Sequence, residues 1–339
     1  MSSVELSPED ALRLNVLLAG EVHAVRIDEG ARTLYALTPK GEARIVLNPV
    51  GRAERYVQRV REVLAGHVLG SPGGYPVYLR RWTRMGQAGE KNLEALLKLG
   101  EPEAVLAVAH AAGLTDELAR RAWWAGQQLA TMEIARVMLM HPAVRTGQMG
   151  PVLTRHLVDY LPFEQDPLAA MQTVRVVLAG GLLGEEERLQ LWAKGKRRPH
   201  YLIGFLEHLP DELPPEPARP LLQGLPDIPA AQLLARCYSG AGQSYLKAAE
   251  LALDKAPTHE AVYLLLDLLG QYFAAGAEAG NLPIAGEEAA ALAALARLSQ
   301  EDAVPILTRT TAVGPLMRRH LEPLIGPIIG HLRRLRAAQ

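Results

Sequence analysis

The spacing of apolar residues divides the chain into a short mixed region and a long helical one. Short stretches rich in β-forming residues and separated by turn residues occur at 22–27, 31–37 and 43–47, and in the third Ala43, Ile45 and Leu47 occupy alternate positions. An apolar period of two is typical of strands, so these stretches predict a three-stranded meander. From about residue 90 onward, apolar residues recur every three or four positions, and this period predicts helices almost throughout.

Helices are also predicted on both sides of the meander. Ser7 can accept a hydrogen bond from a free backbone amide at the start of a helix, and Asp10 occupies the position of a capping-box acid. A short amphipathic helix should therefore extend to about Gly20. A second helix is predicted after Asn48, where residues 56–67 carry an apolar stripe. Residues 1–68 thus resemble a small α/β unit.

The helical region should consist of antiparallel hairpins packed side by side. Its predicted helices are 91–99, 102–112, 115–129, 131–140, 150–161, 167–180, 185–194, 200–209, 229–238, 243–255, 258–274, 286–298, 301–311 and 314–335. The predicted fold class is mainly α, with a small N-terminal α/β unit followed by an irregular solenoid of the HEAT or armadillo kind. No repeat of fixed period is present, so a compact multi-helix domain stays an alternative.

Two stretches are predicted to interrupt the helices. Residues 209–229 are rich in proline, which favours extended or turn geometry, and residues 275–286 are small, polar and glycine-rich, as in a long loop. We predict three parts: a small α/β domain at 1–88, a first helical array at 89–215, and a second helical array at 216–339.

The composition of the chain excludes several kinds of binding and catalytic site. The chain has 339 residues with 36 basic and 37 acidic side chains, so its formal net charge of −1 indicates no general attraction to polyanions or membranes. Its one cysteine, Cys237, excludes an internal disulfide, a thiolate zinc site and a cysteine-ligated cluster. The ten histidines are scattered, without an HExxH pair, and no nucleophile motif is present. We therefore expect no metal, no cofactor and no enzyme activity.

Neither a secretory signal nor a membrane span is predicted. The first residues lack a basic segment followed by an apolar one, and no apolar run approaches the roughly 18–20 residues of a spanning helix. We expect a soluble, cytoplasmic protein.

The stretch at 69–84 is the most unusual part of the sequence. It combines flexible glycines with aromatic and cationic side chains, namely Gly73, Gly74, Tyr75, Tyr78, Arg80, Arg81, Trp82 and Arg84. This mixture suits phosphate, nucleobase or protein binding. It lacks the sequence context of a P-loop or of a dinucleotide site, so an ordered loop that packs between domains is the other interpretation.

Two further features could belong to a binding surface. Trp123 and Trp124 are adjacent on a predicted helix, so they cannot both face the same core, and one should pack against a neighbouring helix or a partner. Short basic runs at 194–198, 318–320 and 333–336 could meet nucleic acid phosphates, but cations near helix ends are also ordinary partners of the helix dipole.

Several segments together resemble a known family. They are residues 11–19, 40–44, 67–87, 99–105 and 113–125, with a weaker likeness at 157–167 and 201–214. They are similar to the DsrS proteins, which are associated with the reverse dissimilatory sulfite reductase gene cluster of sulfur-oxidising bacteria. The resemblance implies a soluble cytoplasmic accessory protein of sulfur oxidation with a regulatory role, and it carries over no catalytic residue.

Three classes of function follow. A non-enzymatic scaffold or regulator that binds a protein partner on its helices is favoured, because helical arrays offer large surfaces without a catalytic group. That partner would belong to the sulfur-oxidation machinery. A nucleic-acid-binding regulator, acting on RNA, is the second class. An enzyme is the third, and it would need a pocket with convergent polar groups.

Overall fold

The computed structural model describes residues 5–70, 90–129, 131–221, 225–282, 284 and 286–336. By its contacts the chain divides into two compact units, Met1–Asp159 and Tyr160–Gln339. The predicted divisions after residues 88 and 215 lie at other positions along the chain. Each unit has a hydrophobic core of its own.

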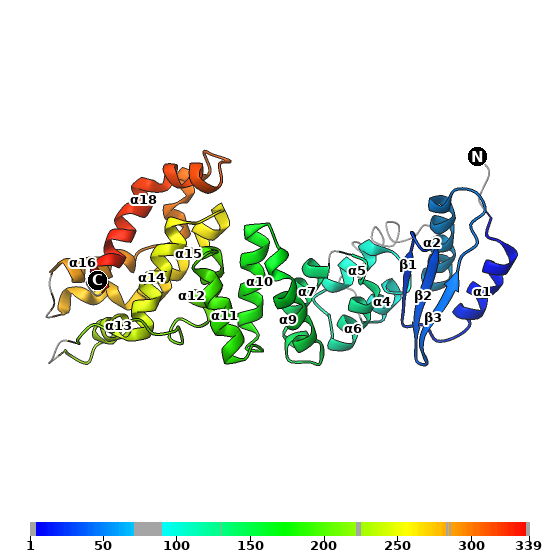
Figure 1. The fold of residues 1–339 in the computed structure, drawn as a ribbon, viewed down its shortest axis with the longest axis horizontal. Coiled ribbons are helices and arrows are strands. Elements are labelled where there is room, and N and C mark those ends of the chain that lie inside the picture. The colour runs from blue at the N-terminus through cyan, green and yellow to red at the C-terminus, as the bar shows by residue number, and fades with distance from the viewer. Residues whose placement is uncertain are drawn as a thin grey trace. The chain divides into compact units, whose positions relative to one another are not determined.

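The first unit begins with the predicted meander. Strands β1 (Ala24–Asp28), β2 (Thr33–Thr38) and β3 (Gly41–Val46) form one antiparallel sheet in the order β1-β2-β3. The register pairs Ile27 with Leu34 and Leu34 with Ile45, so buried side chains lie on one face of the sheet. Helices α1 (Pro8–Leu18) and α2 (Ala53–Leu69) lie beside this sheet (Figure 1).

A buried carboxylate ties α1 to α2 and to the end of the sheet. Ser7 caps α1 as predicted, since its hydroxyl accepts from the Asp10 amide at 3.2 Å. The predicted capping box is wrong, because the Ser7 amide donates to the Tyr56 hydroxyl instead of to Asp10. Asp10 is fully buried and accepts from the Tyr56 hydroxyl at 2.6 Å and from the Asn48 amide at 2.7 Å.

Helices make up the rest of the first unit. They are α4 (Glu90–Leu96), α5 (Pro102–Ala109), α6 (Asp116–Ala125), α7 (Thr131–Leu139), α8 (Pro142–Arg145) and α9 (Met149–Tyr160). The short α8, which begins at a proline, was not predicted. Helix α6 packs against β1, and the Val25 amide donates to the Leu97 carbonyl at 2.8 Å, so the sheet is bound to the helices that follow it.

All the regular elements in the described part of the second unit are helices. Its elements are η1 (Leu161–Phe163), α10 (Pro167–Ala179), α11 (Glu185–Gly195), η2 (Pro199–Tyr201), α12 (Leu202–His208), α13 (Pro229–Tyr238), α14 (Gly240–Asp254), α15 (His259–Tyr272), η3 (Ala274–Asn281), α16 (Gly286–Leu295), η4 (Gln300–Asp302), α17 (Val304–Leu307) and α18 (Gly314–Leu335). Residues 275–286 were predicted as a loop, and the first part of this stretch, up to Asn281, belongs to the 3-10 helix η3. Residues 301–311, predicted as one helix, form the two short pieces η4 and α17.

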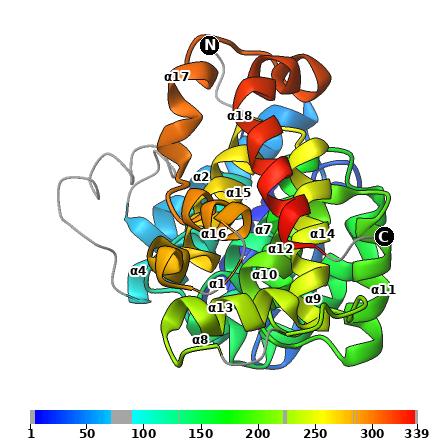
Figure 2. The same ribbon diagram turned by 90° about the vertical axis from the view of Figure 1, so that its left-hand side faces the viewer.

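Glycines set how closely the helices of the second unit approach. Helix α14 packs against α13, α15 and α18, and Figure 2 shows α14 and α18 side by side. A Cβ atom on Gly242 of α14 would overlap the Arg236 carbonyl oxygen, and one on Gly270 of α15 would overlap the Leu298 carbonyl oxygen. Both positions therefore need glycine for steric reasons, because the obstacle is backbone and cannot rotate away.

The proline-rich stretch is extended, as predicted, and it is packed against helices. Its amides at Glu216 and Arg219 donate to the carbonyls of Gly240 and Tyr238. The Arg219 guanidinium lies 4.1 Å from the centre of the Tyr238 ring and 2.8 Å from a Glu288 oxygen. These contacts make the stretch part of the second unit.

The mainly helical fold with a small N-terminal sheet is confirmed. Across the described parts of the chain, strands occur only between residues 24 and 46, and the strand considered at 75–82 lies outside the described residues. None of the described helices has the length and apolar character needed to cross a membrane.

Candidate functional site

Most of the sequence-predicted site lies outside the described residues. Gly73, Gly74, Tyr75, Tyr78, Arg80, Arg81, Trp82 and Arg84 all belong to this group. The structure describes the entry to that stretch, where Gly70 ends α2 in the left-handed conformation with φ of 63°. It also describes the other two candidates, Trp123 and Trp124.

Trp123 and Trp124 point to different neighbours from α6. Trp123 is half-buried, and its ring meets the His156 ring edge-on, with centroids 4.8 Å apart. Burial in this contact lowers the pKa of His156, which keeps the imidazole neutral near pH 7. The His156 Nε2 atom lies 3.1 Å from the Thr131 hydroxyl, so Trp123 covers a polar link between α9 and α7.

Trp124 packs on the sheet through a charged cluster. Its Nε1 donates to a Glu42 carboxylate oxygen at 3.1 Å, and the same oxygen accepts from Arg26 at 3.0 Å. The Arg26 guanidinium lies 4.6 Å from the Tyr35 ring centre and 4.8 Å from that of Trp124. A cation between two aromatic faces is a stabilising arrangement, so Trp124 joins α6 to the sheet.

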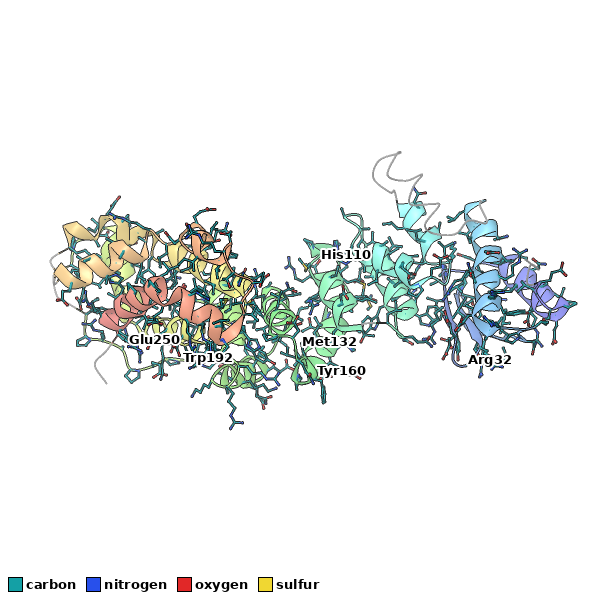
Figure 3. All side chains as sticks on the ribbon, turned by 90° about the horizontal axis from the view of Figure 1, so that it is seen from above. Arg32, His110, Met132, Tyr160, Trp192 and Glu250 are labelled. Carbon is teal, nitrogen blue, oxygen red and sulfur yellow. The ribbon has the colours of Figure 1, made fainter. Side chains whose placement is uncertain are left out.

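The basic run at 333–336 is paired with acidic side chains of the second unit, whereas Arg319 and His320 in the run at 318–320 are exposed. Glu250, labelled in Figure 3, accepts from both Arg333 and Arg336. Arg334 lies 3.7 Å from Glu287, and Arg318 donates to the Ala256 carbonyl. Such pairing reduces the positive field of these side chains. In the run at 194–198, Lys194, Lys196 and Arg197 are exposed and form no ion pair within the described part of the chain.

An apolar groove of about 350 Å³ lies in the second unit beside α11. Apolar residues and prolines form most of it, namely Leu189, Trp192, Phe205, Leu209, Leu213, Pro214 and Pro215. Trp192, labelled in Figure 3, meets the Phe205 ring edge-on at 5.2 Å, and Leu189 is 47% exposed. The charged lining residues are Glu185, Glu212 and Arg188, and Arg188 pairs with Glu212 at 3.2 Å. The groove is therefore apolar with an acidic rim.

A second pocket, of about 240 Å³, lies in the first unit where α2 ends. It is lined by Leu18, Gly20, Val22, His67, Val68, Ala95 and Lys98. Its ionisable lining residues are His67 and Lys98, and no carboxylate is among the described residues that line it.

Shifted pKa values in the described residues have structural causes. Hydrogen bonding to Arg120, and then to Arg121, lowers the pKa of Glu117 to about 2 on an exposed face of α6. Burial raises the pKa of the Cys237 thiol to about 12, so this cysteine is protonated and unreactive near pH 7. No cluster of three or more potential metal ligands occurs among the described side chains. These groups therefore supply no recognisable catalytic set.

His200 makes the second unit sensitive to acid. Burial, and then the charge of Arg198, lower the pKa of His200 from 6.5 to about 4. The unfolded chain therefore takes up this proton first, so His200 favours folding fully above pH 6.5, and that contribution is lost as the pH falls through about 4. We expect His200→Phe, which keeps a ring against Tyr201, to lose less stability between pH 7.5 and 5. Urea unfolding at both pH values measures this difference, and equal losses in the two proteins would contradict it.

Comparison of the chain with models of known protein families, with curated proteins and with solved structures finds no match. The apolar groove and the exposed basic run at 194–198 are therefore the features on which function can be argued. The groove was missed by sequence reasoning, because its lining comes from residues 185–192 and 205–215, which show no common motif. The only sequence signal was the pair of adjacent prolines, Pro214 and Pro215.

Proposed function

We propose that this chain is a non-enzymatic scaffold that binds a partner protein in the groove beside α11. The carrying observation is the apolar surface of Leu189 and Trp192 at the mouth of this groove. An aromatic and an aliphatic side chain that line a pocket at the surface are typical of protein interfaces. Water next to these side chains would be released when a partner covers them, which favours binding.

The rim of the groove specifies the chemistry of the partner. Glu185 and Glu212 give it two negative charges against the one positive charge of Arg188. A partner segment with a bulky apolar side chain next to lysine or arginine would match both the lining and the rim. A volume of about 350 Å³ is enough for one or two such side chains, so we propose a short peptide segment of the partner as the occupant.

The wider role rests on the resemblance to the DsrS proteins. It supports an accessory or regulatory protein of oxidative sulfur metabolism, with a partner from the sulfur-oxidation machinery. The many helices after the sheet support an irregular helical array of the HEAT or armadillo kind, which would present the groove on an extended surface.

A photo-crosslinking residue at position 189 tests the proposed function in a native host grown on reduced sulfur. The matched control carries the same residue at Leu316, which is 54% exposed in the same unit. We expect a protein adduct at position 189, resistant to nuclease and absent at position 316. The crosslinked partner peptide should contain a bulky apolar residue beside lysine or arginine. No adduct at 189, or the same adduct at both positions, would contradict the proposal.

A charge substitution then measures the contribution of the groove. Leu189→Glu should weaken binding of the crosslinked peptide at least tenfold, because it removes an apolar contact and places a carboxylate against the apolar side chain of the peptide. Leu316→Glu should leave the affinity unchanged. Calorimetric titration of the synthetic peptide into each protein gives both affinities, and unfolding midpoints show whether each variant is folded.

A further inference from the structure

Two exposed aromatic rings stand together at the start of the second unit. Phe163 is 76% exposed and Tyr160 is 52% exposed, and their ring centroids are 6.3 Å apart with planes inclined at 55°. Tyr160 is labelled in Figure 3. Large apolar rings are usually at least half covered in folded proteins, so an adjacent pair at the surface indicates a contact site.

Hydrogen bonds from residues near η2 hold the turn that carries these rings. Arg198 donates to the Pro162 carbonyl at 3.2 Å, and the Tyr201 hydroxyl lies 3.4 Å from the Leu161 carbonyl oxygen. Arg198 also donates to the Tyr201 hydroxyl at 2.8 Å, which links the two anchoring groups. Arg198 and Tyr201 thus hold two carbonyls of η1. The backbone that carries Phe163 is therefore ordered, and Phe163 loses little conformational freedom when it binds.

Exposed cations precede Arg198, the residue that anchors this turn, along the chain. Lys194, Lys196 and Arg197 precede Arg198 by one to four residues, and all three are exposed. Within the described part of the chain, none of the three forms an ion pair, unlike the arginines at 333–336. We call Tyr160, Phe163, Lys194, Lys196 and Arg197 the aromatic-basic surface.

Two of the acidic residues near this surface, Glu164 and Asp166, accept from backbone amides, whereas Asp159, next to Tyr160, is exposed. Asp166 accepts from the amides of Leu168 and Ala169 at the start of α10, and Glu164 accepts from the Asp166 amide at 3.1 Å. Their negative charge is thereby directed towards the helix N-terminus, where it is favoured. Lys194, Lys196 and Arg197 supply the positive charges of the aromatic-basic surface.

We propose that the aromatic-basic surface binds single-stranded nucleic acid. Unpaired bases can stack on Phe163 and Tyr160, while the phosphates between them meet Lys196 and Arg197. A duplex is a poorer match for this surface, because its bases are already stacked on one another. An acidic peptide is also a poorer match, because it has negative charges but no bases to stack on Phe163 and Tyr160. This surface is distinct from the groove beside α11, so the inference does not depend on the partner proposed there.

Fluorescence anisotropy of a labelled 20-nucleotide oligouridine tests this inference with the full chain. We expect binding that weakens as salt rises, and weaker binding of an RNA duplex of the same length. Phe163→Leu keeps an apolar side chain but removes the ring, and it should weaken oligouridine binding about tenfold, the effect of losing one stacked base. Leu316→Ala, at another exposed apolar position, is the matched control and should bind like the unaltered chain.

A pair of charge-reversal variants separates the aromatic-basic surface from the general charge of the protein. Lys196→Glu/Arg197→Glu should abolish oligouridine binding, whereas Arg309→Glu/Arg319→Glu, with the same change in net charge at exposed positions of the same unit, should change it less than threefold. Equal losses in both pairs, equal binding by Phe163→Leu and the unaltered chain, or equal competition by polyglutamate would each overturn the proposal. So would the absence of any oligouridine binding at low salt.

Discussion

Gly270→Ala should destabilise the second unit by about 3 kcal/mol or more. The added Cβ would overlap the Leu298 carbonyl oxygen, and α15 would have to move away from the chain that follows α16. Overpacking against backbone costs about 1–3 kcal/mol and occasionally more, because no rotamer change relieves it. Urea unfolding followed by circular dichroism measures the change.

Gly330→Ala is the matched control for that variant. Gly330 lies in α18 of the same unit, and a Cβ there would have no neighbour within 4 Å. Alanine in a helix interior then stabilises by about 0.5–1 kcal/mol, because it restricts the unfolded chain. Opposite signs for the two variants are expected. A stable Gly270→Ala protein would show that α15 and residue 298 are not in close contact.

Asp10→Ala should destabilise the first unit by about 3–5 kcal/mol. It removes a fully buried carboxylate that accepts from the Tyr56 hydroxyl and the Asn48 amide, and it leaves both donors without that acceptor. Hydrogen bonds to a charged group contribute about 1.5–3 kcal/mol each, and a buried donor without a partner adds a desolvation cost. Thermal and urea unfolding of the purified variant measure the loss.

The neighbouring acid provides the comparison for Asp10. Glu9 is exposed and pairs with Arg13 one turn further along α1, so Glu9→Ala should cost less than about 0.5 kcal/mol. A small effect of Asp10→Ala, similar to that of Glu9→Ala, would mean that Asp10 does not hold α1 against Tyr56.

The sequence predicted the elements well where local signals and burial agree. Thr115 and Thr258 cap α6 and α15, and the apolar stripe of α15 is buried as its period predicted. The sequence-based prediction was less accurate where the role of small residues depends on tertiary contacts. Helix α14 begins at Gly240, three residues before the predicted start at 243, because the Ser239 hydroxyl accepts from the Gly242 amide.

The same limit applies to the binding surfaces. Trp192 and Phe163 look like ordinary apolar residues in the sequence, and only the fold shows that each is exposed or lines a groove. The run at 194–198 was visible as charge, but its approach to Phe163 depends on the Arg198 contact with Pro162, across 36 residues. Pairing of the arginines at 333–336 depends likewise on Glu250 and Glu287, far away along the chain.

Because Cys237 is buried, the rate at which its thiol is modified can report how often the second unit opens. It is the only cysteine in the sequence, it is fully buried in α13, and it lies in the second unit. A thiol reagent can reach it only when that unit opens, so the modification rate at low reagent reports the opening free energy of residues 160–339. Because the first unit has no thiol, Asp10→Ala and Gly270→Ala can be told apart in the intact protein by this rate alone.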